Sequence, residues 1–503
     1  MTRVRPRTNR ARNEKAPRRL PAAALLLSLV GVTTAVACRK PPPDEVVYTG
    51  QSAGTVGAQP PGTGGTPPSG AGGAPPSGTG GAQSSGAGGA QPPGAGGAAP
   101  ATGSGATGAT TAASTSAATG GAGGGEPGGA QCAPVTAPEG PFTKAGLLTA
   151  AADCALNRAC EFEARARALH ESASALARAP GEPSAAAARD AWRAAIAVWQ
   201  EAEVFRFGPA ASSLQPGGQD LRDQIYSWPL VSRCKIEEQI VSRAYAQPGF
   251  SSSLINARGL AALEYLVFYG GSDNACSQFS TINASRTWAA LGAGELAQRK
   301  ADYAAAAAAD VLTRAGALAR AWAPEAGSFR EQLTRAGRGS AVFATEQDAL
   351  NAVSDAMFYV EKELKDWKLA RPLGFTEDCV TPTCPEALES RFALASTSHL
   401  RANLRGFRRL FQGCGEGGEG LGFDDWLREV GSADLADRML EALSGAEAAV
   451  EGLDPPLEQA LVSDRAKVEA VYYAVKALTD LIKTELVTAL NLELPQSSEG
   501  DND

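Results

Sequence analysis

Residues 256–270 read Asn-Ala-Arg-Gly-Leu-Ala-Ala-Leu-Glu-Tyr-Leu-Val-Phe-Tyr-Gly. Residues at steps of three and four share one face of a helix, and here the apolar ones at that spacing are Leu260, Leu263, Leu266 and Val267. Glu264 is the only acid in the run. A carboxylate buried among such neighbours loses hydration energy unless a cation or several donors meet it. The stretch therefore predicts a buried helix with either a structural ion pair or a binding site at Glu264.

The same helical periodicity extends through the rest of the chain from about residue 141. We expect helices at 145–179, 184–207, 236–244, 254–269, 285–322, 344–367, 386–412, 432–452 and 464–490. Pro216-Gly217-Gly218 predicts an irregular segment, and runs typical of strands have almost no support. The fold class is all-α, with two helical bundles expected at residues 141–325 and 326–503.

The first 37 residues have the plan of an export signal. Eight Arg and Lys residues precede an apolar run from Leu20 to Ala37. Ala35-Val36-Ala37-Cys38 resembles a bacterial lipobox, which makes Cys38 the expected lipidation site and first residue of the mature chain. An ordinary signal peptide or a signal anchor is the alternative. We expect an exported protein held on a membrane by its lipid, facing the periplasm or the cell surface.

Residues 38–140 are dominated by Gly, Ala, Pro, Ser and Thr, with near-repeats of Gly-Ala-Gly-Gly-Ala. Such a composition cannot bury a core, so a disordered tether is expected. The net charge of the whole chain is −8, which argues against a nucleic-acid partner because phosphate binding depends on clustered Lys and Arg.

Cysteine usage fits an oxidising compartment. Nine cysteines are present, and setting Cys38 aside leaves an even number. Among many pairings, the disulfides we single out are Cys234 with Cys276 and Cys379 with Cys384. Zinc is the rival interpretation of the second pair, but no further pair or nearby His completes four ligands.

Several motifs carry a family resemblance. Gly259 to Glu264 has the spacing Gly-x-His-x-x-Glu, with Ala261 in the histidine position. Further motifs follow in order along the chain: Trp199-Gln200-Glu201-Ala202-Glu203, Leu221-Arg222, Trp228-Pro229, Arg371-Pro372-Leu373-Gly374, Glu389-Ser390-Arg391-Phe392 and Asn403-Leu404-Arg405-Gly406. Together they resemble the imelysin-like family of peptidase-related bacterial envelope proteins over about residues 145–503.

The resemblance implies two helical bundles, with the motif near their contact, and a link with iron acquisition. It also implies a metal-dependent peptidase in which the motif His and Glu act at a metal. Only Glu264 of that pair is present, because Ala261 offers no lone pair, and catalytic zinc generally needs three protein ligands. We therefore assign no catalytic residue. The two histidines, His170 and His399, are expected to be solvent-facing or structural.

A polar cluster between the bundles is the remaining candidate site. Arg222 is expected to pair with Glu264 and, with backbone donors, to keep its charge. The candidate pocket comprises Glu264, Arg222, Trp228, Glu201, Asn403 and Glu389, with Glu203 and Asp223 as further oxygen donors. Two interpretations stay open: the cluster locks the bundles together, or it binds a ligand.

The function that we expect is binding in the cell envelope, with a divalent metal, iron, a metal chelate or a partner uptake protein as the first candidates. A metallopeptidase and a structural adaptor without a small ligand are the alternatives.

Overall fold

The computed structural model describes residues 141–324, 329–415 and 419–495. The expected signal peptide, Cys38 and the tether to residue 140 lie outside these ranges. Every regular element in the described ranges is a helix, as the periodicity predicts. None of these helices is long and apolar enough to cross a membrane.

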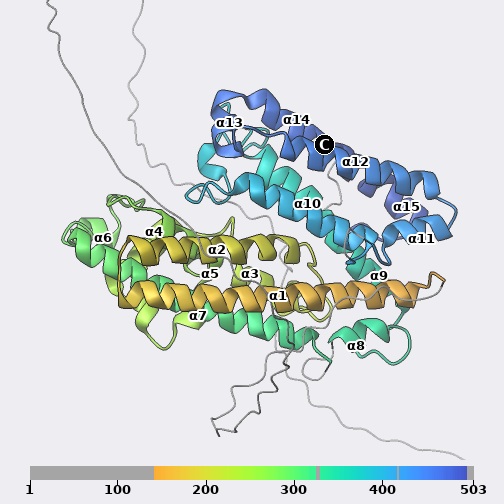
Figure 1. Cartoon of the computed structure of the whole chain (residues 1–503), viewed down its shortest axis with the longest axis horizontal. Coiled ribbons are helices and arrows are strands. Elements are labelled where there is room, and N and C mark those ends of the chain that lie inside the picture. The colour runs from red at the N-terminus through yellow and green to blue at the C-terminus, as the bar shows by residue number, and fades with distance from the viewer. Residues whose placement is uncertain (1–140, 325–328, 416–418, 496–503) are drawn as a thin grey trace, which may run out of the picture. The chain divides into compact units, whose positions relative to one another are not determined.

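The first group of helices is built around α1 (Lys144–Arg178), which packs along both α2 (Glu182–Ala202) and α7 (Ala293–Trp322) (Figure 1). The opening stretch forms α5 (Gly259–Phe268), packed against α2 and α7. Shorter elements complete the group: η1 (Gly208–Ala210), α3 (Leu221–Ile225), α4 (Arg233–Ser242), η2 (Ala244–Ala246), η3 (Phe250–Ser252), η4 (Ile255–Ala257), α6 (Thr281–Ala284) and α8 (Phe329–Thr334).

The second group centres on α10 (Ser396–Gln412), α12 (Ala433–Glu451) and α14 (Arg465–Leu481). The α12 helix packs on α10 and α14, and both of these pack on the π-helix η6 (Val360–Ala370). The apolar stripe of α14 is fully buried. The remaining elements are α9 (Glu346–Asp355), η5 (Ala356–Phe358), η7 (Pro385–Ala387), α11 (Phe423–Glu429), α13 (Leu457–Ser463), the π-helix η9 (Ile482–Leu486) and α15 (Val487–Leu490).

The two groups meet where α2 packs directly against α10. Gly406 makes this close approach possible, because a Cβ at that position would lie 2.6 Å from the Glu201 carbonyl oxygen. A disulfide between Cys154 of α1 and Cys414, just beyond α10, also joins the groups. The spacing of these two cysteines in the sequence did not predict their pairing. Polar side chains on the facing surfaces of α2 and α10 are therefore held at a buried contact.

Two of the helices that begin later than predicted shape the site. The helix expected from residue 254 begins at Gly259, whose φ is 78° and whose Cβ position lies 2.6 Å from the Ile225 carbonyl oxygen. The helix expected from residue 386 begins at Ser396, because Ser390 and Leu394 have φ values of 48° and 53° that a helix does not allow. The resulting turn at 390–394 faces α5.

Other predicted boundaries also move. The helix expected to reach residue 207 ends at Ala202, and the one expected from residue 285 begins at Ala293 after the short α6. Cys234 is disulfide-bonded to Cys276, and Cys379 to Cys384. Each bond closes a loop beside the cavity described next.

Candidate functional site

Glu264 lines a cavity of about 230 Å³ between α5 and the segment 371–392. We call this space the Glu264 cavity. Ala261, one turn before Glu264 on α5, also lines it, so the methyl group at the motif's histidine position faces the same space. The wall combines aromatic and charged side chains: Trp228, Arg233, Tyr265, Arg371, Asp378, Glu386, Arg391 and Phe392.

Glu264 is held by backbone donors of the 390–394 turn. Its Oε1 accepts hydrogen bonds from the amides of Phe392 (2.9 Å) and Ala393 (3.0 Å). Burial nevertheless raises the pKa of the Glu264 carboxyl from 4.5 to about 7, against the lowering effect of the two amides and with a further rise from Glu389. The donors therefore only partly offset the lost hydration, and Glu264 keeps its charge only in part at pH 7.

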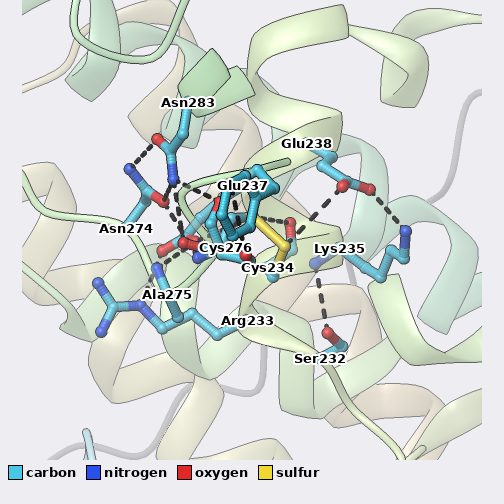
Figure 2. The surroundings of a disulfide bond; sticks show 12 residues. Ser232, Arg233, Cys234, Lys235, Glu237, Glu238, Asn274, Ala275, Cys276 and Asn283 are labelled. Carbon is cyan, nitrogen blue, oxygen red and sulfur yellow. Dashed lines mark hydrogen bonds and ion pairs between the residues drawn. A yellow bond between two sulfur atoms is a disulfide. The ribbon is translucent and has the colours of Figure 1, made fainter. Parts of the chain in front are cut away.

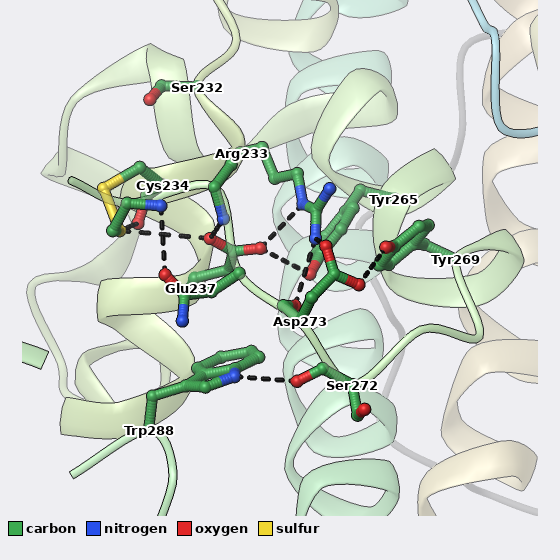
Figure 3. A network of polar contacts seen from close by, with 12 residues as sticks. Ser232, Arg233, Cys234, Glu237, Tyr265, Tyr269, Ser272, Asp273 and Trp288 are labelled. Atoms are coloured by element: carbon green, nitrogen blue, oxygen red, sulfur yellow. Dashed lines mark hydrogen bonds and ion pairs between the residues drawn. A yellow bond between two sulfur atoms is a disulfide. The ribbon is translucent and has the colours of Figure 1, made fainter. Parts of the chain in front are cut away.

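Arg233 forms a fixed cationic part of the cavity wall (Figure 3). Its Nε donates to Glu237 Oε1 (2.7 Å) and its Nη2 to Asp273 Oδ2 (2.8 Å). The guanidinium lies 4.2 Å from the ring centre of Tyr269, and the Tyr265 hydroxyl donates to Glu237 Oε1 (2.9 Å). Arg233 is thus oriented by two carboxylates and an aromatic face.

Arg391 is the less constrained cation of the cavity. It lies over the Phe392 ring at 4.9 Å and has no carboxylate partner within the described ranges. A neighbouring recess of about 410 Å³ shares Arg233, Leu388 and Arg391 with the Glu264 cavity and extends to Glu458. Arg391 therefore stands between two hollows, with its charge available to a ligand.

A second polar site fills the contact between α2, η6 and α10. We call it the seam cluster, and its members are Gln200, Glu203, Arg222, Tyr226, Tyr359, Lys368, Glu389, His399 and Asn403. The Lys368 ammonium donates to Gln200 Oε1 (2.6 Å) and Asn403 Oδ1 (2.8 Å). It also lies 3.1 Å from Glu389 Oε1 and 3.2 Å from Glu203 Oε1. None of these five side chains is more than 3% exposed.

Glu389 is the most heavily bonded acid of the seam cluster. Its Oε1 accepts from the Tyr226 hydroxyl (2.6 Å) and Gln200 Nε2 (2.9 Å), while His399 Nδ1 lies 3.2 Å from Oε2. Burial acts to raise the pKa of Glu389, but Lys368 and His399 beside it hold that pKa below its ordinary value. His399 is buried, so the alternative that it faces solvent is wrong.

The structure divides the predicted pocket residues among three places. Glu264, Ala261 and Trp228 line the Glu264 cavity, whereas Glu389 and Asn403 belong to the seam cluster. Glu201 lies apart and pairs with Arg158, Arg405 and Arg409.

The partner predicted for Arg222 is also wrong. Its Nη2 lies 3.5 Å from Glu203 Oε2 and its Nη1 donates to Asp223 Oδ1 (2.8 Å). The α3 helix places Arg222 against Glu203, at the end of α2, while backbone amides of the 390–394 turn take the place beside Glu264.

A bare metal ion does not fit the Glu264 cavity. Of the three carboxylates that line it, Glu264 already accepts two amides at one oxygen and Asp378 is paired with Arg371, which leaves Glu386, and Ala261 has no lone pair. In the described part of the chain, metal-ligand spacing is found only for Cys234, Glu238 and Cys276. The two sulfurs of this group are joined in the disulfide, and Glu238 is paired with Lys235 (Figure 2). The group therefore has no thiolate to bind a metal.

Sequence reasoning missed the residues that compensate charge. Lys368 and Gln200 gave no periodic signal that separates them from solvent-facing residues of a helix. The amides of Phe392 and Ala393 have no side-chain signature, and Arg391 appeared only as part of a family segment.

The fold and the two sites define an all-helical protein whose halves meet at a buried ionic seam with a cavity beside it. The chain belongs to the imelysin family: residues 155–484 match the family model described as imelysin, peptidase M75.

The relatives agree with this assignment. Iron-regulated protein A of Synechococcus elongatus is 24% identical over 323 residues, which is 63% of this chain and 79% of that protein. A putative iron-regulated protein A precursor from Parabacteroides distasonis has a similar structure, with a TM-score of 0.54, 16% identity and coverage of 70% of this chain and 96% of that one. An imelysin-like protein from Psychrobacter arcticum gives a TM-score of 0.52, 18% identity and coverage of 72% and 99%.

Proposed function

We propose that this chain is an exported binding protein of the cell envelope, anchored through a lipid on Cys38, with the Glu264 cavity as its binding site. Its ligand is a small anion, such as a carboxylate-bearing chelate of iron, which it binds in place of a bare metal ion. Handing that ligand to an uptake protein of the envelope would complete such a role.

The charges on the cavity wall carry the proposal. Three guanidinium groups, those of Arg233, Arg371 and Arg391, line the cavity together with the carboxylates of Glu264, Asp378 and Glu386. Arg233 and Arg371 are paired with carboxylates, whereas none of the described carboxylates pairs with Arg391. Because the pKa of Glu264 is about 7, that acid is largely neutral below pH 7 and then donates a hydrogen bond without repelling an anion. Guanidinium groups pair with carboxylates in a fixed planar geometry.

The iron part of the proposal rests on the relatives named as iron-regulated proteins. An iron chelate fits both the names of the relatives and the residues of the cavity, because the chelator itself supplies the ligands of the metal and presents carboxylates to the arginines. Hydrolysis at a protein-bound metal has less support because Ala261 replaces the motif histidine.

Calorimetric titration of the purified protein tests the proposal. Ferric citrate and metal-free citrate are expected to give saturable heats at pH 6, whereas ferrous, zinc and calcium salts give none. Affinity should fall at pH 8, where Glu264 is ionised. Glu264→Gln mimics the neutral acid and should keep its affinity at pH 8. Binding of bare ions alone, or Glu264-dependent cleavage of a peptide library, would overturn the proposal.

The anchor is tested separately in cells. Metabolic labelling with a palmitate analogue should mark the wild-type protein and be lost in Cys38→Ala. Equal labelling of both proteins would remove the lipid from the proposal.

A further inference from the structure

The seam cluster leads to an inference that does not depend on the Glu264 cavity. We propose that the cluster is a cation-binding site whose occupant is the protein's own Lys368 ammonium, so that the two groups of helices are joined without a metal ion. Truncation of Lys368 vacates a site that binds a small free cation, and an organic ammonium ion is the closest replacement.

The number of oxygens around Lys368 is the first observation. Oxygens of Gln200, Glu203, Glu389 and Asn403 lie 2.6 to 3.2 Å from Nζ. An ammonium group has only three protons to donate. Four acceptors around three protons resemble the oxygen shell of a metal cation more than an ordinary lysine hydrogen-bonding pattern.

The chemistry of these oxygens is the second observation. Two come from carboxylates and two from side-chain amides, which are the donor types that hard cations take. Outer groups orient both carboxylates, because the Tyr226 hydroxyl donates to Glu389 (2.6 Å) and the Tyr359 hydroxyl to Glu203 (2.5 Å). Such an outer shell is characteristic of built metal sites.

Burial makes the positive charge necessary. Glu203 and Glu389 are each 1% exposed, and Oε2 of each has no hydrogen-bond partner. Arg222 and His399 approach these two oxygens at 3.5 and 3.2 Å. Lys368 faces the Oε1 atoms, which also accept from Tyr226 and Tyr359. A buried carboxylate without a nearby cation is strongly disfavoured.

The surroundings of the Lys368 side chain also fit a cation site. Lys368 comes from the π-helix η6, and its ammonium lies 5.8 Å from the ring centre of Trp228 and 5.5 Å from that of Tyr359. π-helical turns are rare and are often found at functional sites. The aromatic rings surround the charge with apolar and polarizable surface, so little water competes for it.

Chemical rescue of Lys368→Ala tests the proposal. Propylammonium replaces the atoms from Cγ to Nζ, while 1-propanol fills the same space without a charge. We expect propylammonium chloride to raise the melting temperature of Lys368→Ala by about 2–4 °C more than 1-propanol at equal concentration and ionic strength. The wild-type protein should show no such gap. Equal effects of amine and alcohol on the variant would overturn the proposal.

Lys300→Ala is the matched control. Lys300 is also buried, but its ammonium donates to one backbone carbonyl, that of Tyr269 (2.8 Å), and faces two tyrosine rings. None of the described carboxylates forms an ion pair with it. The gap between amine and alcohol should be smaller there. An equal gap in both variants would mark a general amine effect and overturn the proposal.

A charge-balanced variant keeps the test decisive where Lys368→Ala does not fold. Lys368→Met/Glu389→Gln removes one charge of each sign and leaves Glu203 with Arg222. It should melt at a higher temperature than Lys368→Met. Failure of both variants to fold would show that the lysine is needed for its shape and would overturn the proposal.

Discussion

The Glu264 cavity and the seam cluster both bury glutamates, yet they treat the charge in opposite ways. In the seam cluster, Lys368 and His399 hold the pKa of Glu389 below its ordinary value. In the cavity, burial raises the pKa of Glu264 to about 7, although two amides donate to it. Glu389 also contributes to the raised pKa of Glu264, whereas a lysine and a histidine lie beside Glu389 itself.

This difference separates two roles for a buried acid. An acid with a cation and several donors is already satisfied, and it stabilises the contact between helices. An acid that lacks a cation, beside a hollow with guanidinium groups in its wall, retains bonding capacity for a ligand.

Removal of the cation from the seam cluster should have the largest effect. Lys368→Met is expected to lower the free energy of unfolding by about 3–5 kcal/mol, because it leaves a buried carboxylate uncompensated. Urea unfolding at pH 7 measures this. Leu490→Met is the control, because it changes a buried side chain without changing its charge. A loss of less than about 1 kcal/mol in Lys368→Met would contradict the view that Lys368 compensates the buried carboxylates.

The pH dependence of stability should reveal Glu264. The pKa of Glu264 is higher in the folded protein than its ordinary 4.5, so the native state binds a proton more tightly than the unfolded state does. The stabilisation that this proton gives to the fold is complete below about pH 4.5 and is lost as pH rises through about 7. The loss should be on the order of 3 kcal/mol.

The difference between wild type and Glu264→Gln isolates this contribution, since Asp355 and Asp424, whose pKa values are also raised, titrate in both proteins. Relative to wild type, the variant should gain stability between pH 4.5 and 8. Parallel stability curves for the two proteins would show that Glu264 is ionised in the fold.

Restoration of the motif histidine should convert the cavity toward metal binding. In Ala261→His an imidazole would join Glu264 one helical turn away on the same face of α5. We expect affinity for cobalt or zinc to rise at least about tenfold, equivalent to about 1.4 kcal/mol. Cobalt absorption spectra measure it, and Ala261→His/Glu264→Gln should lose most of the gain.

The smallest predicted effect is at the cavity edge. Arg391→Gln should weaken citrate binding about fivefold, or about 1 kcal/mol, without changing the melting temperature, because the guanidinium has no carboxylate partner to lose. Arg428→Gln on α11 is the control, as Arg428 does not line the cavity. Equal affinities of wild type and Arg391→Gln would exclude this arginine from the site.

The sequence predicts the buried helix and several residues of the site, but it does not predict the hydrogen bonds and ion pairs between them. Helical spacing identified α5 as a buried helix and Glu264 as its isolated acid, and the family segments identified Glu389 and Asn403. The boundary at Ser396 escaped prediction because Arg391 to Ala395 contains nothing that forbids a helix. Only the φ values of Ser390 and Leu394 reveal the turn whose amides reach Glu264.

The amino-acid sequence was sufficient to predict the helical class and the position of one acid in an apolar stripe, because both depend on neighbours within a few turns of helix. It was also sufficient to predict the family, because the family motifs follow one another in order along the chain. The tertiary structure decided which acid meets a cation. Lys368 reaches Gln200 across 168 residues, and Phe392 reaches Glu264 across 128. Charge compensation depends on distances of a few ångströms between residues that are far apart in the sequence, and these distances cannot be predicted from local periodicity.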